Sequence, residues 1–385
     1  MIRLIRRPIS ISGFLLSLLL LTGMFLAGPC PARAMGVATL PAPEKPAEGG
    51  TAQGPVTIWY PSEARETSRT MGAFVLSGAW DGAPVRGNGA LILLSHGSGG
   101  SDAPYHDIAR VLVEKGFVVG APEHDGDNWR DQSKTGPASW KQRPAEISGA
   151  IDRIQGDPRF APLLDKGRVG VYGMSAGGLT ALEFSGATWS LSRLVKHCAE
   201  HFEDDARFCA YREMAAASGR LDGETTRRLK AQFVEGARSG MVDPKEYGFQ
   251  DSRVKAVVAA VPVGAVIDPA SLRVPRVPTA LISAGMDQVL APRWHVLALE
   301  RACTSCAVLG PLEGGGHLSV LSPLPKSVID SLGEWAEDPP ASTAPLSRLS
   351  TGASPSFSCA FSGPTRPGKG VRLLLPPKRG KLSVP

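Results

Sequence analysis

The residue of this chain best suited to nucleophilic chemistry is a serine flanked by glycines. Ser175 lies in residues 173–178 (GMSAGG), after the apolar run 168–172 and before a helix expected from Leu179. A G-x-S-x-G turn between a strand and a helix exposes the serine hydroxyl at the edge of a sheet, where the positive end of the helix dipole faces it. We therefore predict that Ser175 is a nucleophile.

The partners that a serine nucleophile needs follow it in the chain. Asp287 and His317 each come after a predicted strand, which gives the order Ser, Asp, His of α/β-hydrolase triads. An imidazole takes the serine proton during attack, and a carboxylate holds the imidazole in the required tautomer. Asp268, which follows the preceding strand, remains the alternative acid.

The loop at residues 96–100 (HGSGG) follows a buried strand and is rich in glycine. Backbone N–H groups of such a loop stabilise an oxyanion, and we predict those of Ser98 and Ala176 as the donors. His96, His124 and Met174 are predicted to line the substrate pocket, and His96 also to support the loop.

The elements that must position these residues alternate between strand and helix. Strands are expected at 56–61, 73–76, 90–95, 117–121, 168–172, 254–261, 277–283 and 306–309, and helices at 105–115, 144–156, 292–302 and 326–337. Short apolar strands between amphipathic helices predict an α/β fold with a mostly parallel sheet and helices on both faces. Functional loops then gather at the carboxyl ends of the strands.

Composition divides the chain into segments. Residues 1–34 have a basic start, a leucine-rich run and a small-x-small site, which predict a cleaved signal peptide. Residues 35–54 are expected to form a flexible linker, and residues 55–337 an α/β-hydrolase domain. Within that domain, 189–250 is predicted to be a helical lid insertion. Residues 338–385 have the composition of a disordered low-complexity tail.

Export predicts a periplasmic or secreted protein, with an uncleaved membrane anchor as the alternative. An oxidising compartment favours disulfides. The natural local pairs are Cys198 with Cys209 and Cys303 with Cys306, which leaves Cys359 over. A redox or metal role for the CTSC sequence at 303–306 is an open alternative.

The net charge of +6 comes from the two ends of the chain. Eleven of the 42 Lys and Arg lie before residue 35 or after residue 338, where there is no acid, so 31 basic residues face 36 acidic ones in the body. This balance gives no basic face for nucleic acid.

Four motifs in order carry a resemblance to a known family: WYP at 59–61, SHGSGG at 95–100, EHDGDN at 123–128 and GMSAGG at 173–178. Together they resemble the predicted dienelactone hydrolase family, in the bacterial branch similar to platelet-activating-factor acetylhydrolases. The resemblance spans residues 55–337.

This resemblance implies an α/β-hydrolase fold and ester hydrolysis by a Ser-Asp-His triad, with no metal or other cofactor. It matches Ser175 to the nucleophile, His317 to the base, and Ser98 and Ala176 to the oxyanion positions. True dienelactone hydrolases use a cysteine nucleophile, so the dienelactone name is not carried over as an activity. Met174 and Ala176 also differ from the residues that often flank the nucleophile in relatives.

The sequence thus predicts an exported serine hydrolase for small-molecule carboxylic esters, without a nucleic-acid partner or stable membrane insertion after signal removal. The oligomeric state and the natural substrate stay open. The alternatives are a hydrolase of another acyl bond, in an amide or a polyester, and a non-catalytic binding protein on the same scaffold. A thiol redox protein using Cys303 and Cys306 is a third.

Overall fold

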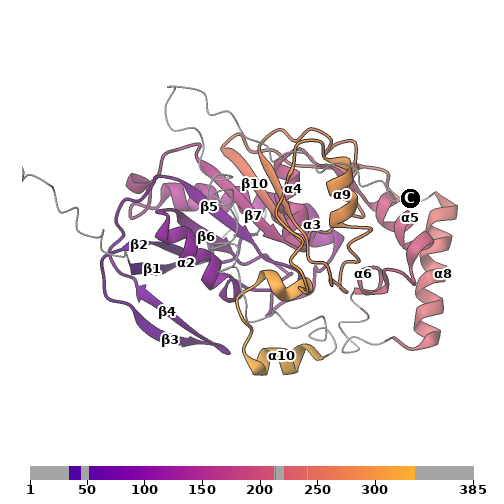
Figure 1. Ribbon diagram of the computed structural model, residues 1–385, viewed down its shortest axis with the longest axis horizontal. Coiled ribbons are helices and arrows are strands. Elements are labelled where there is room, and N and C mark those ends of the chain that lie inside the picture. The colour runs from indigo at the N-terminus through magenta and orange to yellow at the C-terminus, as the bar shows by residue number, and fades with distance from the viewer. Residues whose placement is uncertain (1–33, 45–51, 212, 214–220, 241, 334–385) are drawn as a thin grey trace, which may run out of the picture. The chain divides into compact units, whose positions relative to one another are not determined.

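The computed structural model describes residues 34–44, 52–211, 213, 221–240 and 242–333 (Figure 1). The predicted signal peptide (apart from Ala34), the predicted tail and Cys359 lie outside these residues. The strands of the main sheet are β1 (Ala34–Leu40), β2 (Val56–Ser62), β3 (Thr67–Met71), β4 (Phe74–Trp80), β5 (Leu91–Ser95), β6 (Val118–Pro122), β7 (Val169–Met174), β10 (Val254–Ala260), β11 (Thr279–Ile282) and β12 (Ala307–Val308).

In the described part of the chain these ten strands follow the order β12-β11-β10-β7-β5-β6-β2-β1-β4-β3. The neighbours from β12 to β6 are all parallel, whereas β2 is antiparallel to β6 and to β1, and β3 is antiparallel to β4. The parallel half therefore presents the carboxyl ends of six strands along one edge. The predicted α/β fold with a mostly parallel sheet is confirmed.

The parallel strands are buried on both faces, which explains their unbroken apolar sequences. In β5, Leu91 and Leu93 belong to one hydrophobic cluster, while Ile92 and Leu94 belong to the other. On the second face lies α2 (His106–Glu114), and on the first lie α3 (Pro137–Gly156) and α4 (Ala176–Phe184) (Figure 1). Ser175, the predicted nucleophile, lies in the connection between β7 and α4.

Helix α3 is longer than predicted. The sequence placed its start at 144, whereas the helix begins at Pro137 and carries Pro144 in its interior. The added first turns matter because Arg143 lies in them and is fully buried. Proline is over-represented in the first turn of a helix, so Pro144 favoured a helix start at that residue, whereas the structure starts α3 at Pro137.

The prediction of a flexible linker at 35–54 is wrong for its first part. Residues 34–40 form β1, which pairs antiparallel with all of β2 and parallel with β4. Met35, Val37 and Leu40 are buried in the core. The Pro- and Gly-rich composition of the residues after β1 obscured this short apolar strand.

The helical insertion (residues 189–250) comprises β8 (Trp189–Ser190), α5 (Leu191–His201), α6 (Ala206–Cys209), α8 (Gly223–Ser239) and β9 (Glu246–Tyr247). Strands β8 and β9 pair with each other at its base, and α5 packs against α8 (Figure 1). The predicted disulfide pairs are both present: Cys198–Cys209 joins α5 to α6, and Cys303–Cys306 follows α9 (Val296–Ala302). The last described helix is α10 (Lys326–Leu332).

Among the described helices, none combines the length and the apolar character that crossing a membrane requires.

Candidate active site

Ser175 occupies the sharp turn between β7 and α4. Its backbone has φ 58° and ψ −119°, a conformation that L-residues other than glycine rarely adopt. Four backbone hydrogen bonds hold the strained residue. Its N–H donates to the Ala260 carbonyl at 3.0 Å, and its own carbonyl accepts from Gly178 at 2.9 Å, from Val263 at 3.1 Å and from Leu179 at 3.2 Å. Strain of this kind persists only where the surroundings impose it, and it is concentrated at functional sites.

The glycines around Ser175 are required by close packing. A Cβ on Gly173 would lie 1.8 Å from the Gly177 carbonyl oxygen, and one on Gly177 would lie 2.0 Å from the Ser95 carbonyl oxygen. Any larger residue at either position would push α4 away from the sheet. The GMSAGG pattern is therefore explained by the geometry of the turn.

His317 and Asp287 are in direct contact. Nδ1 of His317 lies 2.8 Å from Oδ2 of Asp287, and both side chains are buried. Oδ1 of the same carboxylate accepts the N–H groups of Val289 at 2.9 Å and Leu290 at 2.8 Å. Because a carboxylate only accepts, Nδ1–H of His317 must be the donor, so in the neutral imidazole Nε2 is free of a proton and able to act as a base.

The alternative acid, Asp268, has other partners. Its carboxylate lies 3.5 Å from the Arg193 guanidinium and accepts the N–H of Ala270 at 3.2 Å. It is also partly exposed, whereas the acid of a triad is buried against its histidine. The geometry favours Asp287.

The predicted oxyanion loop lies against the turn that contains Ser175. A Cβ on Gly97 would lie 3.1 Å from Sδ of Met174 and 3.4 Å from Cβ of Ser175. The backbone of the loop thus approaches the serine as closely as the absence of a side chain allows. Gly97 therefore packs directly against Met174 and Ser175.

A buried ion pair contacts the predicted oxyanion loop at residues 96–100. The Arg143 guanidinium lies 2.8 Å from Oδ2 of Asp127, donates to the carbonyls of His96 and, at 3.4 Å, of Gly97, and neither side chain of the pair is exposed. Oδ1 of Asp127 accepts the Gly99 N–H at 2.9 Å. The groups on both sides of the Ser98 amide are thereby fixed.

This ion pair sets the charge state of its acid. Burial acts to raise the pKa of Asp127, but the Arg143 charge and hydrogen bonds from Ser139, Gly99 and Arg143 outweigh it and hold the pKa at about 2. The carboxylate is therefore ionised at neutral pH and accepts hydrogen bonds from the loop.

The structure places the predicted pocket residues beneath the site rather than at its surface. His96, His124 and Met174 are 2%, 0% and 3% exposed. Nδ1 of His96 lies 2.7 Å from the Gly97 carbonyl, and Nε2 accepts the His124 N–H at 3.2 Å. The support role predicted for His96 agrees with these bonds. His124 has both ring nitrogens bonded inside the protein, so its position does not fit contact with a substrate.

His124 belongs to a buried array that has the composition of a second triad. Its Nε2 lies 2.8 Å from Oγ of Ser95, and its Nδ1 lies 2.5 Å from Oε2 of Glu146. Burial raises the pKa of Glu146 to about 8 and, together with the Arg143 charge, lowers the pKa of His124 well below its usual value. Ser95 is fully buried, so the array braces the end of β5 and is closed to substrate.

Sequence reasoning missed Asp127, Arg143 and Glu146 as parts of the site. One signal was present: Arg143 and Glu146 precede Ile147 on the apolar face of α3, where a charged side chain needs a buried partner. Asp127 lies within the EHDGDN motif at 123–128, but the motif does not indicate that this carboxylate pairs with a buried arginine.

Comparisons with known proteins give a fold-level likeness. No family model matches the chain, and no curated protein matches it. Among solved structures, a ferulic acid esterase from Streptomyces cinnamoneus is similar over 87% of this chain and 91% of that one, with 17% identity and a TM-score of 0.49. A likeness this weak carries no argument about activity. The resemblance to the predicted dienelactone hydrolase family accordingly stays a prediction.

Proposed function

We propose that this protein is an exported serine hydrolase that cleaves small carboxylic esters, with Ser175 as nucleophile, His317 as base and Asp287 as the acid that orients it. The observation that carries the proposal is the hydrogen bond from Nδ1 of His317 to Asp287, 2.8 Å long. It lies at the same edge of the parallel sheet as the strained Ser175, because all three residues follow strands of the parallel half.

In the proposed reaction, Oγ of Ser175 attacks the ester carbonyl carbon while its proton passes to Nε2 of His317. The carbonyl oxygen becomes an oxyanion and is held by the N–H groups of Ser98 and Ala176. The C–O bond of the ester breaks, and the alcohol leaves with the proton from His317. Water then attacks the acyl-enzyme, His317 again takes and returns the proton, and the carboxylic acid is released.

The proposed compartment rests on two features. The chain begins with the sequence pattern of a cleaved export signal, and the structure pairs four cysteines in two disulfides. Both fit a periplasmic or secreted enzyme. Cys303 and Cys306 follow the C-terminus of α9, whereas a reactive thiol is favoured at a helix N-terminus, so we do not propose a dithiol redox role for this pair.

The test measures hydrolysis of p-nitrophenyl acetate by wild type and by Ser175→Ala, with the exposed Ser331→Ala as a matched control. We expect wild type and the control to turn over alike and Ser175→Ala to lose at least about 10³-fold in kcat. Turnover retained in Ser175→Ala would refute the assignment. Replacing the ester by p-nitroacetanilide separates ester from amide cleavage, because the amide has the poorer leaving group.

A further inference from the structure

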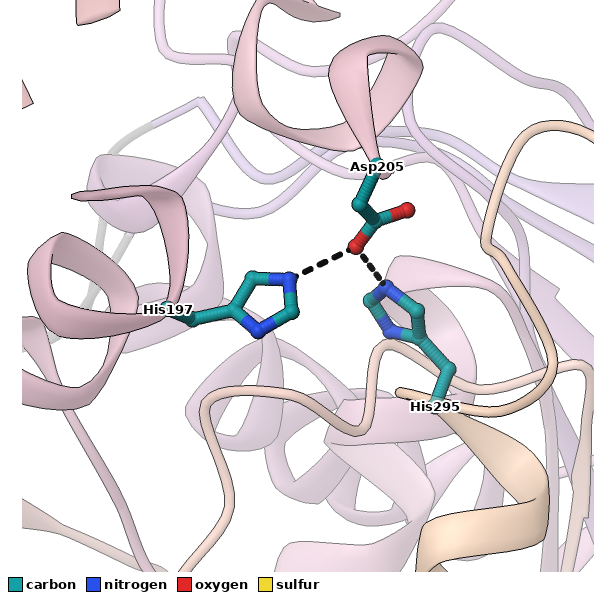
Figure 2. Close-up of side chains that lie close together, drawn as sticks. All are labelled: His197, Asp205 and His295. Atoms are coloured by element: carbon teal, nitrogen blue, oxygen red, sulfur yellow. Dashed lines mark hydrogen bonds and ion pairs between the residues drawn. The ribbon is translucent and has the colours of Figure 1, made fainter. Parts of the chain in front are cut away.

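A cluster of two histidines and an aspartate joins the helical insertion to the rest of the molecule. Oδ2 of Asp205 lies 2.7 Å from Nε2 of His197 and 2.8 Å from Nε2 of His295 (Figure 2). Asp205 and His197 come from the insertion, whereas His295 directly precedes α9. All three side chains are buried.

The composition of this cluster suits a metal ion, but its hydrogen bonds do not. Nδ1 of His295 accepts the N–H of Gly264 at 3.0 Å, so in the neutral ring the proton is on Nε2, which then donates to Asp205. A protonated nitrogen has no lone pair for a metal. Figure 2 shows both imidazoles directed at the same oxygen, as expected of two donors that share one acceptor.

The Asp205 carboxylate is ionised in this setting. Burial acts to raise the pKa of Asp205, but hydrogen bonds from His197 and His295 and electrostatic attraction to the two rings outweigh it and bring the pKa to about 2. The disulfide between Cys198 and Cys209 closes the segment that contains Asp205. The insertion therefore presents a fixed acceptor at this point.

Asp205 is linked to Asp287, the acid of the proposed triad, through the backbone of two adjacent residues. Oδ1 of Asp205 accepts the N–H of Ala291 at 3.2 Å. The preceding residue, Leu290, donates its N–H to Oδ1 of Asp287 at 2.8 Å. Asp205 thus holds the same short loop that fixes the carboxylate of Asp287.

A second path leads from Asp205 to the nucleophile. His295, which is bonded to Asp205, accepts the N–H of Gly264, and the neighbouring Val263 donates its N–H to the Ser175 carbonyl at 3.1 Å. Tyr211, two residues beyond the disulfide, donates its hydroxyl to the Ser98 carbonyl at 3.3 Å. The same short piece of the insertion therefore contacts the supports of all three parts of the site.

We infer that Asp205 is a positioning residue for the proposed catalytic triad, and that the insertion is fastened to the catalytic loops at this end. This inference rests on the proposed function of Ser175. It predicts that loss of the Asp205 carboxylate releases the loops of Asp287 and Ser175 and misplaces the reacting groups. A misplacement of about 1 Å from a distant change costs on the order of 10²-fold in rate.

The experiment compares wild type, Asp205→Ala, Asp205→Asn and His295→Gln with p-nitrophenyl acetate. We expect kcat to fall about 10- to 100-fold in Asp205→Ala and less in Asp205→Asn, which keeps one acceptor oxygen, with KM changed less than about threefold. Glu203→Ala is the matched control, because Glu203 is exposed in the same segment and pairs with Lys230. Its kcat should match that of wild type.

Active-site titration with a fluorophosphonate normalises each rate to the competent fraction of enzyme, and Asp205→Asn serves where Asp205→Ala does not fold. If the Asp205 variants fold and keep the wild-type kcat, the inference is overturned. Labelling of wild type by the fluorophosphonate would in that case still support the proposed function. Absence of labelling in wild type would instead refute the function itself. A stoichiometric metal in purified wild type, lost with activity on chelation, would also overturn the inference.

Discussion

Nδ1 of His317 and Oδ2 of Asp287 lie 2.8 Å apart, although the two residues come from loops after different strands. The loops are tied to each other beside this contact, because Met286 donates its N–H to the Gly315 carbonyl at 2.9 Å. The histidine is thereby held in one tautomer and one orientation, which is what a base for Ser175 requires.

Asp287→Asn should abolish most activity while leaving the fold intact. The amide preserves size but can donate to Nδ1 and so favours the wrong tautomer of His317, and we expect kcat to fall by about 10⁴-fold. Ester hydrolysis and circular dichroism measure the two effects. Asp268→Asn is the control and should retain wild-type kcat, because Asp268 pairs with Arg193. The opposite ranking of the two variants would assign the acid to Asp268.

Arg143→Met should destabilise the protein and impair the oxyanion loop. Removing one member of a fully buried ion pair leaves Asp127 uncompensated, which typically costs about 3–5 kcal/mol in the free energy of unfolding. Chemical denaturation measures this loss. Arg253→Met is the control, because Arg253 pairs with Asp152 and Asp251 while remaining partly exposed. Equal destabilisation by the two substitutions would contradict the role given to the buried pair.

Glu146→Gln should change the pH dependence of stability. Burial raises the pKa of Glu146 to about 8 in the folded state, so the folded protein holds a proton that the unfolded chain loses above its ordinary pKa. Stability from this group is complete below about pH 4.5 and is lost as the pH rises toward 8. Glutamine mimics the protonated acid at every pH.

The variant should therefore match wild type at about pH 4 and exceed it at about pH 9 by at least about 1 kcal/mol. Urea denaturation at the two pH values provides the measurement. A variant less stable than wild type at pH 9 would show that Glu146 is ionised beside His124.

The two disulfides should differ in how much each stabilises the folded protein. Cys198–Cys209 closes a separation of 11 residues and Cys303–Cys306 one of 3, for which loop entropy predicts about 3 and about 1.5 kcal/mol of stabilisation. Double serine variants of each pair, compared by thermal unfolding, measure the difference. The first pair should also lower kcat when removed, because it closes the segment that contains Asp205. Wild-type kcat without it would argue against that link.

The sequence was sufficient for the residues that follow buried strands. Apolar runs such as 90–95 and 168–172 identify parallel strands, and whatever follows them reaches the same edge of the sheet. The sequence alone therefore predicts that Ser175, Asp287 and His317 lie at one site. The glycines of the turn carried equally local information, since each is required by one close backbone approach.

Contacts between distant segments left no comparable trace. Asp205 and His295 are 90 residues apart, and neither lies in a recognisable pattern. The sequence pattern did not place Arg143 in a helix, because Pro144 suggested a later start for α3. It did not predict β1, because the residues after this strand have the composition of a linker. In each case the observed structure depends on contacts between segments that are distant in the sequence, which local patterns do not reveal.

Activation of Ser175 as a nucleophile can be measured by labelling the protein with a fluorophosphonate and locating the adduct by peptide mass spectrometry. We expect one adduct per chain, located on Ser175, absent in Ser175→Ala and formed much more slowly in Asp287→Asn. An adduct on another residue, or wild-type protein that stays unlabelled at excess reagent, would contradict it.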